Sequence, residues 1–170
     1  MSTEDKVLNG VNVTQLLRYI WKVRNDPTLA DRNPTLVAHW VGESRSRIEF
    51  RKIVTHIGGE GELNPMMMLL SSYAACQVDL VVLHASFLGL KIKSLSVEAT
   101  GHFDVRRYLG FDDAPGPGYD KIVLTVRIRA PGATPEQVAH LREKCERSCP
   151  VGDSLAQAIP LKLEIEADSS

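Results

Sequence analysis

The chain has 170 residues, of which 44% are hydrophobic and 24% are charged, so it can close one substantial core but not two. Its 20 basic and 21 acidic residues give a formal net charge of −1, which argues against binding to nucleic acid or to an anionic membrane. No run reaches the ~18 uninterrupted apolar residues of a spanning helix, and the amino end lacks a secretion-signal pattern. We therefore expect one soluble domain in the cytoplasm, with neither a nucleic-acid nor a membrane partner.

The first predicted element is a short amphipathic helix. Asn12 is a suitable N-cap, and apolar residues recur at helical spacing until Asn25-Asp-Pro27 ends the pattern; they are Val13, Leu16, Leu17, Ile20 and Val23. Because residues 28–34 have the composition of a linker, we divide the chain into an N-terminal helix and linker, residues 1–34, and a single α+β domain, residues 35–170.

Strands are predicted where β-branched and aromatic residues gather or where apolar residues alternate with polar ones. The apolar parity changes near Arg51 within one of these segments, which predicts a bulge or corner there. The last segment alternates with a period of two and is expected to form an edge strand. The predicted strands are residues 36–41, 47–57, 91–105, 121–130 and 161–166.

The most unusual segment is a predicted helix of about six turns over residues 66–88. Asn64-Pro65 is a strong start signal and Gly89 a natural stop. The helix is apolar nearly all the way round, so we expect most of its faces to be packed. A single small sheet covers only one side of such a helix, and we therefore expect a partner subunit to cover the rest.

Two further segments complete the predicted domain. Residues 106–120 form a connection longer than a hairpin needs, which makes it a candidate lid. Thr134-Pro-Glu-Gln137 is a capping box that begins a helix ending near Cys149-Pro150, and a second short helix is expected over residues 150–158. The order of the predicted elements indicates an α+β fold: strands, a buried helix, strands, a helix and a strand.

The three cysteines, Cys76, Cys145 and Cys149, are too few for a disulfide framework, and one must stay unpaired within a monomer. The local context of Cys76 is typical of a small buried residue. Cys149 precedes Pro150 and is expected at a helix N-cap, where backbone N–H groups and the helix dipole lower a thiol pKa. The alternative for Cys149 is a turn residue without chemistry.

A metal or cofactor site is not expected from the motifs present. Cys145, Cys149 and His140 lie close in sequence, but structural zinc needs four ligands in recognisable pairs and no second pair exists. The chain also lacks a glycine-rich phosphate loop, a nucleophile elbow and a zinc-protease motif.

Three motifs in a fixed order resemble the pattern of the OsmC/Ohr family: Asn64-Pro65, Ala74-Ala-Cys76 and Cys149-Pro-Val151. The resemblance spans residues 37–166, and the N-terminal helix is similar to that of an OsmC-like branch with such an extension. It implies an intertwined homodimer in which curved antiparallel sheets wrap around two central helices. It also implies a peroxidase that reduces organic hydroperoxides and is itself reduced by a dithiol.

The resemblance assigns a role to each of two cysteines. Cys76 would attack the peroxide and Cys149 would close a disulfide, because a thiolate that cleaves an O–O bond needs a resolving partner and a cationic neighbour. Cys145 lies on the stripe of Val138 and Leu141, so we expect it to be packed, protonated and free when the other two are bonded.

The family's orienting glutamate is replaced here by Met66 and Met67. The nearest carboxylates in sequence are Glu60 and Glu62, and the active-site arginine is expected to be Arg47, with Arg45 as the alternative. A second hypothesis is a non-catalytic dimer that binds an apolar small molecule in an interfacial cleft lined by residues 66–70 and the 106–120 loop.

Overall fold

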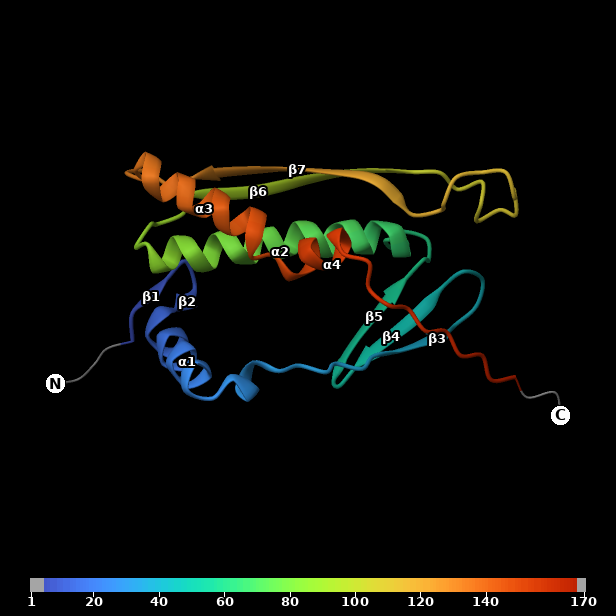
Figure 1. The fold of residues 1–170 in the computed structure, drawn as a ribbon, viewed down its shortest axis with the longest axis horizontal. Helices are drawn as coiled ribbons and strands as arrows, with labels where there is room; N and C mark the ends of the chain where they lie inside the picture. The colour runs from blue at the N-terminus through green and yellow to red at the C-terminus, as the bar shows by residue number, and fades with distance from the viewer. Residues whose placement is uncertain (1–4, 168–170) are drawn as a thin grey trace.

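The computed structural model describes residues 5–167, which are arranged around one long central helix (Figure 1). This helix, α2 (Pro65–Phe87), lies beneath the antiparallel strands β6 (Ser94–Phe103) and β7 (Tyr119–Arg129). The helices α3 (Pro135–Arg147) and α4 (Pro150–Ala156) pack against α2. The α+β class predicted from the sequence is confirmed.

The predicted central helix is confirmed with its start signal. The Asn64 side chain accepts the N–H of Met67 at 2.8 Å, and Pro65 occupies the first helical turn. Its cover is one-sided, since only five of its 23 residues are buried: Gln77, Leu80, Val81, Ala85 and Ser86. α2 is long and apolar enough to cross a membrane, but this is weak evidence because core helices of soluble proteins share these properties.

The N-terminal elements lie beside the C-terminal end of α2 (Figure 1). A hairpin of β1 (Val7–Leu8) and β2 (Val11–Asn12) leads into α1 (Val13–Asn25), which confirms the helix predicted there, and a short 3-10 helix, η1 (Pro27–Ala30), follows. The side chain of Asn12 caps α1 by accepting the N–H of Gln15 at 2.9 Å. The division of the chain at residue 34 stays a prediction.

The three-stranded sheet corrects one sequence prediction. β3 (Val37–Trp40), β4 (Ser46–Phe50) and β5 (Ile53–Ile57) form an antiparallel sheet in this order. The expected single bent strand over residues 47–57 is therefore wrong. The chain reverses at Arg51, whose φ of 55° suits a two-residue hairpin turn, and this reversal explains the change of apolar parity.

The predicted edge strand over residues 161–166 is also wrong, because this segment forms no strand. Its apolar side chains are almost fully exposed: Leu161 is 94%, Leu163 84% and Ile165 81% accessible. An alternating pattern favours a strand only where another strand offers a free edge, and this segment pairs with none within the described chain.

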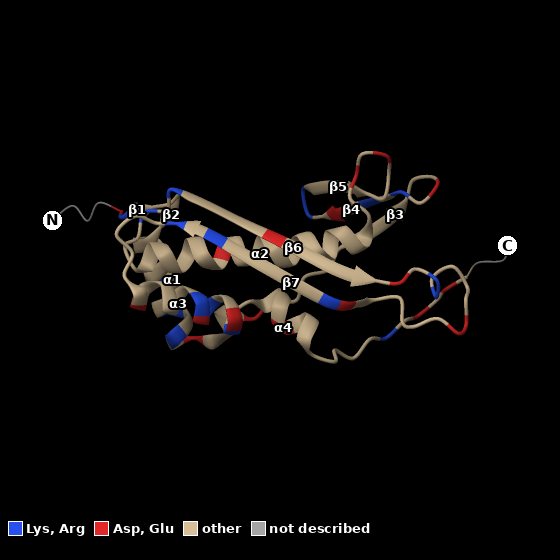
Figure 2. Ribbon diagram, turned by 90° about the horizontal axis from the view of Figure 1, so that it is seen from above, with Lys and Arg blue, Asp and Glu red and all other residues tan. Residues whose placement is uncertain are grey.

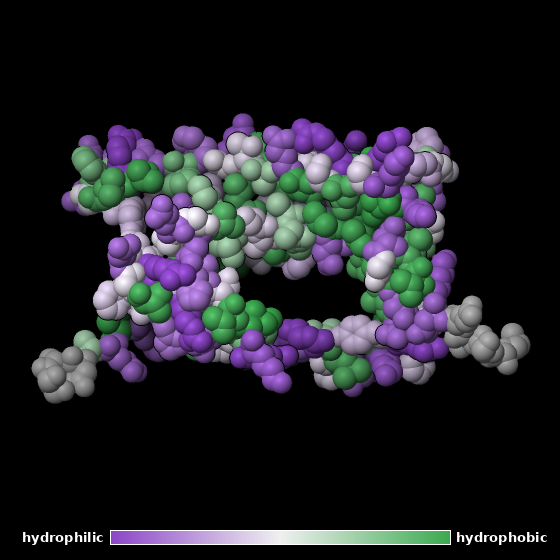
Figure 3. Space-filling view, turned by 180° about the vertical axis from the view of Figure 1, so that it is seen from behind, coloured by the Kyte–Doolittle hydropathy of each residue, from purple (hydrophilic) through white to green (hydrophobic). Residues whose placement is uncertain are grey.

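The apolar surface of α2 remains partly open. Figure 2 shows charged residues on the strands and on α3, whereas the α2 ribbon is mostly uncharged. In space-filling view, an opening passes through the molecule between α2 and the α1–β3 connection, with hydrophobic side chains along its α2 edge (Figure 3). On α2 itself, Met67 is 51% and Leu69 38% exposed. The single chain therefore covers only part of this helix, as expected for one small sheet, and cover of the remaining faces by a partner subunit stays a prediction.

Candidate functional site

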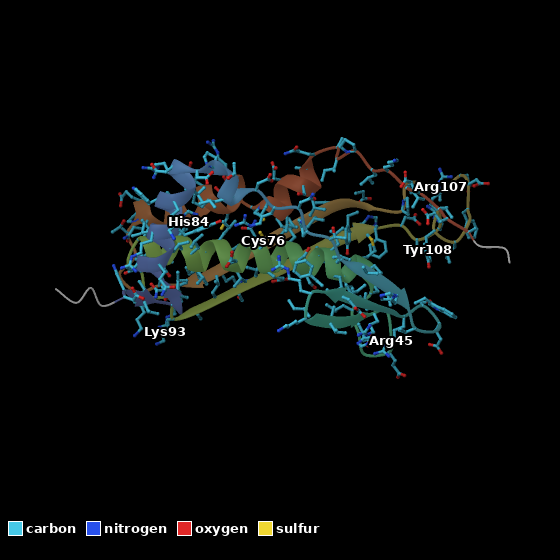
Figure 4. The ribbon with its side chains drawn as sticks, turned by 90° about the horizontal axis from the view of Figure 1, so that it is seen from below. Arg45, Cys76, His84, Lys93, Arg107 and Tyr108 are labelled. Carbon is cyan, nitrogen blue, oxygen red and sulfur yellow. The ribbon has the colours of Figure 1, made fainter. Side chains whose placement is uncertain are left out.

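The central feature of the candidate site is a pair of free thiols. The Sγ atoms of Cys76 and Cys149 lie 3.1 Å apart, although the residues are 73 positions apart in the sequence. Cys76 is half-buried in the middle of α2 (Figure 4), and Cys149 is 4% exposed. The structure thus brings together the two cysteines to which the family resemblance assigned redox roles.

The position of Cys149 follows from the way α3 ends. Ser148 is the C-cap of α3, and Cys149 is the N-cap of α4, with Pro150 in the first turn of that helix. The N–H of Gly152 donates to Cys149 Sγ at 3.3 Å. The N-cap position expected from Cys149-Pro150 is therefore confirmed, and the sulfur occupies the place where a serine or aspartate oxygen commonly caps a helix.

Burial favours the neutral form of the Cys76 thiol. Its pKa is raised first by burial, then by the hydrogen bond with Cys149, while the backbone N–H of Val151 acts in the opposite direction. The nearby carboxylate of Asp79 adds a further upward contribution. Because the thiolate is the nucleophile, Cys76 needs a cation beside it before it can attack a peroxide efficiently.

The third cysteine, Cys145, is half-buried in the last turns of α3. Its pKa is raised by burial first, and then by Cys149 and Glu146. Its backbone oxygen accepts a hydrogen bond from Gln77 Nε2 at 3.0 Å. Cys145 also lines a cavity of about 530 Å³ between α2, α3 and β7, whose other walls include Tyr73, Val81, Leu124, Val126 and Leu141.

The candidate arginines are not in contact with this thiol pair. Arg47 lies on β4 and forms an ion pair with Glu49 of the same strand. Arg45 forms an ion pair with Glu62 and lies in the connection between β3 and β4, directly before β4 and well apart from Cys76 (Figure 4). Within residues 5–167, no hydrogen bond or ion pair joins either arginine to Cys76 or Cys149.

The remaining sequence-derived features lie away from the thiols. Tyr108, in the proposed lid, is 81% exposed and lies beyond the far end of the two-stranded sheet (Figure 4). His140 stacks edge-on against His84, with 5.5 Å between the ring centroids. In the part of the chain that the structure describes, no group of three or more His, Cys, Asp or Glu side chains is placed to hold a metal ion.

Two features of the site were not found by the sequence analysis. One is the contact of Gln77 with the end of α3, which had a sequence signal, because Gln77 is a polar residue inside an apolar helix directly after Cys76. The other is the pair of backbone N–H groups at Val151 and Gly152 that face the two sulfurs. These groups depend on the local backbone turn, which a sequence pattern does not specify.

Comparison with known proteins identifies the fold. The sequence profile of the OsmC-like protein family matches residues 58–164. The structure is similar to an OsmC-like protein from Mycoplasma pneumoniae, with a TM-score of 0.61 and 19% identity over 74% of this chain and 88% of that one. This similarity confirms the OsmC-like fold expected from the sequence.

Two further solved structures are similar. An OsmC-like protein of unknown function from Vibrio cholerae has a TM-score of 0.59 and 13% identity, over 74% of this chain and 95% of that one. An organic hydroperoxide resistance protein from Legionella pneumophila has a TM-score of 0.50 and 18% identity, over 74% and 90% of the two chains. No curated protein matches the sequence.

Proposed function

Because the chain belongs to the OsmC-like protein family, which it matches over residues 58–164, we propose that it is a thiol-dependent peroxidase acting on organic hydroperoxides. The observation that carries this proposal is the 3.1 Å separation of Cys76 Sγ and Cys149 Sγ. A peroxidatic thiol and a resolving thiol must be this close for a disulfide to form without rearrangement of the backbone.

The reaction proceeds in two steps on the protein. The Cys76 thiolate attacks the outer oxygen of the hydroperoxide, so that an S–O bond forms, the O–O bond breaks, and the alkoxide leaves as an alcohol after taking up a proton. The Cys149 thiolate then attacks the sulfur of the resulting sulfenic acid, and water leaves as the Cys76–Cys149 disulfide forms. A dithiol reductant restores both thiols and becomes a disulfide itself.

The cation that activates Cys76 is proposed to come from a second subunit. Arg47 is the residue predicted from the sequence, and Arg45 is its alternative. The contact with Glu62 favours Arg45 as the activating residue. Glu62 supplies the orienting carboxylate that the side chains of Met66 and Met67 cannot provide.

A homodimer accounts for the open surfaces of the single chain. The exposed side of α2, the free edges of both larger sheets and the unpaired segment 161–166 all present groups that a second copy can cover. Such an intertwined dimer would bury well over ~2,000 Å². We place this protein, with its nearly balanced charge, in the cytoplasm.

Thiol counting with cumene hydroperoxide tests the proposed activity. The wild-type protein should lose two titratable thiols together, and Cys145→Ser should lose the same two. Cys76→Ser should consume no hydroperoxide, whereas Cys149→Ser should be oxidised once and stop at the sulfenic acid. Equal turnover by Cys76→Ser and the wild type would end the peroxidase proposal.

The cavity beside Cys145 supports a second candidate function, the binding of an apolar small molecule. Its volume of about 530 Å³ and its largely aliphatic walls suit such a ligand. It lies between α2, α3 and β7, not at the 106–120 loop where the sequence placed an apolar cleft. Val126→Phe would fill the cavity, so it should abolish binding of an apolar fluorescent probe while leaving thiol oxidation unchanged.

A further inference from the structure

Gln77 is a buried amide placed beside the thiol pair. It follows Cys76 on α2, and only 4% of its surface is exposed. Its Nε2 atom donates to the backbone oxygen of Cys145 at 3.0 Å, whereas its Oε1 atom has no hydrogen-bond partner among the described residues. An unpaired buried oxygen destabilises the folded state. The burial of this amide despite that cost points to a role for the bond that its Nε2 atom makes.

The oxygen of Cys145 is one of the backbone acceptors that the end of α3 leaves free. In a continuing helix, the N–H of Cys149 would donate to this oxygen. Because α3 ends at Arg147 and Cys149 turns away to cap α4, the helix cannot supply that donor. Gln77 Nε2 takes its place, so a side chain of α2 satisfies this free carbonyl at the end of α3.

We propose that Gln77 is a positioning residue for the redox pair, fixing the end of α3 so that Cys149 stays opposite Cys76. The proposal rests on the redox function of these two cysteines. Cys76 and Gln77 are neighbours on one helix, and they contact Cys149 and Cys145, which are four positions apart across the end of α3. The two contacts together define both the distance and the orientation of Cys149.

This role separates the effect of Gln77 on stability from its effect on disulfide formation. Gln77→Met keeps a side chain of similar length and removes both the bond to Cys145 and the unpaired Oε1 atom. These two changes oppose each other in the free energy of unfolding, so the variant should be about as stable as the wild type. Disulfide formation should nevertheless weaken, because the end of α3 is no longer tied to α2.

Gln137 provides a matched control at the other end of α3. Its Nε2 atom lies 3.5 Å from the oxygen of Leu88, and its Oε1 atom accepts the N–H of Thr134 in the capping box. Gln137→Met therefore also removes a link between α3 and the end of α2, but far from Cys149 in the sequence. It should lower stability through the lost cap without changing the cysteine geometry.

The test is a redox titration of the full chain carrying Cys145→Ser, which leaves only the two redox thiols. The ratio of oxidised to reduced glutathione sets the redox potential of the solution. The fraction of protein with the Cys76–Cys149 disulfide then gives the effective concentration of the two thiols. We expect about a tenfold loss for Gln77→Met and less than a twofold change for Gln137→Met. Gln77→Asn, whose shorter side chain cannot reach Cys145, should behave like Gln77→Met.

Several results would overturn the proposal. An effective concentration for Gln77→Met within twofold of its parent contradicts it, as does an equal loss in Gln137→Met. If neither Gln77 variant folds while Gln137→Met does, the amide serves folding and not cysteine position. A parent protein that forms the disulfide with glutathione but ignores cumene hydroperoxide would refute only the peroxidase function, and one that never forms it would refute both.

Discussion

Glu62 binds one edge of the Arg45 guanidinium, with Nε and Nη2 lying 3.0 and 2.5 Å from its Oε1 atom. The second carboxylate oxygen, Oε2, accepts the N–H of Gly59 at 3.0 Å. The pKa of Glu62 is lowered, chiefly by its hydrogen bond with Arg45. The carboxylate therefore stays ionised to a lower pH than a free glutamate does, and its contacts favour one orientation of Arg45.

A comparison of two carboxylate variants can identify the activating arginine. Glu62→Gln removes the charge that orients Arg45, and Glu49→Gln does the same for Arg47. If Arg45 serves Cys76, Glu62→Gln should slow the oxidation of Cys76 by cumene hydroperoxide about tenfold or more in stopped-flow measurements, because a misplaced cation stabilises the transition state poorly. Glu49→Gln should stay near the wild-type rate; the reverse pattern would assign the role to Arg47.

The contact between the two thiols affects their pH dependence. A hydrogen bond with Cys149 raises the pKa of Cys76, after burial, and a higher pKa leaves less thiolate at any given pH. Cys149→Ala should therefore lower the pH midpoint for alkylation of Cys76 by iodoacetamide, followed by peptide mass spectrometry. Cys145→Ser is the control and should leave the midpoint unchanged. An unchanged or higher midpoint in Cys149→Ala would contradict this reading of the thiol pair.

The exposed side of α2 should carry the dimer contact. Light scattering of the wild type at micromolar concentration should give twice the 18.8 kDa mass of one chain. Leu69→Glu places a charge on the exposed apolar side and should dissociate or destabilise the assembly. Leu109→Glu, on the exposed loop, is the control and should leave the mass unchanged. A stable folded wild-type monomer would refute the dimer.

Asn9 anchors the N-terminal hairpin to the end of α2. Its Nδ2 atom donates to Ser86 Oγ at 3.0 Å and to the oxygen of Leu90 at 2.9 Å, and its Oδ1 atom accepts the N–H of Ile92 at 2.9 Å. Asn9→Ala breaks all three bonds, so we expect a loss of about 2–3 kcal/mol in urea unfolding.

A second asparagine gives the control for this stability measurement. Asn25 makes one exposed side-chain bond, from Nδ2 to the oxygen of Trp21 at 2.7 Å. Asn25→Ala should therefore cost less than about 1 kcal/mol. Similar losses in the two variants would mean that the Asn9 contacts do not hold the N-terminal segment in place.

Local signals predicted the helices and the two long strands. The Asn64-Pro65 start of α2 and the capping box of α3 involve contacts between residues a few positions apart, which a sequence displays directly. The N-cap position of Cys149 was predictable for the same reason, since proline favours the first turn of a helix.

The errors arose where the structure depends on distant partners. Hydrophobic parity near Arg51 fits both a bulge and a hairpin, and only pairing between β4 and β5 decides between them. The alternating segment 161–166 lacks a neighbouring strand within the described chain. Gln77 is recognisable in the sequence as a polar residue inside an apolar helix, but its partner Cys145 lies 68 positions away and could not be identified from the sequence.

The pairing of the three thiols after oxidation tests the central claim most directly. The protein is treated with one equivalent of cumene hydroperoxide, its remaining thiols are blocked, and its peptides are mapped under non-reducing conditions. The 3.1 Å contact predicts a dominant Cys76–Cys149 peptide with Cys145 alkylated. A dominant Cys145–Cys149 or Cys76–Cys145 peptide would contradict the account, because Cys145 would then replace one of the two thiols assigned to the redox pair.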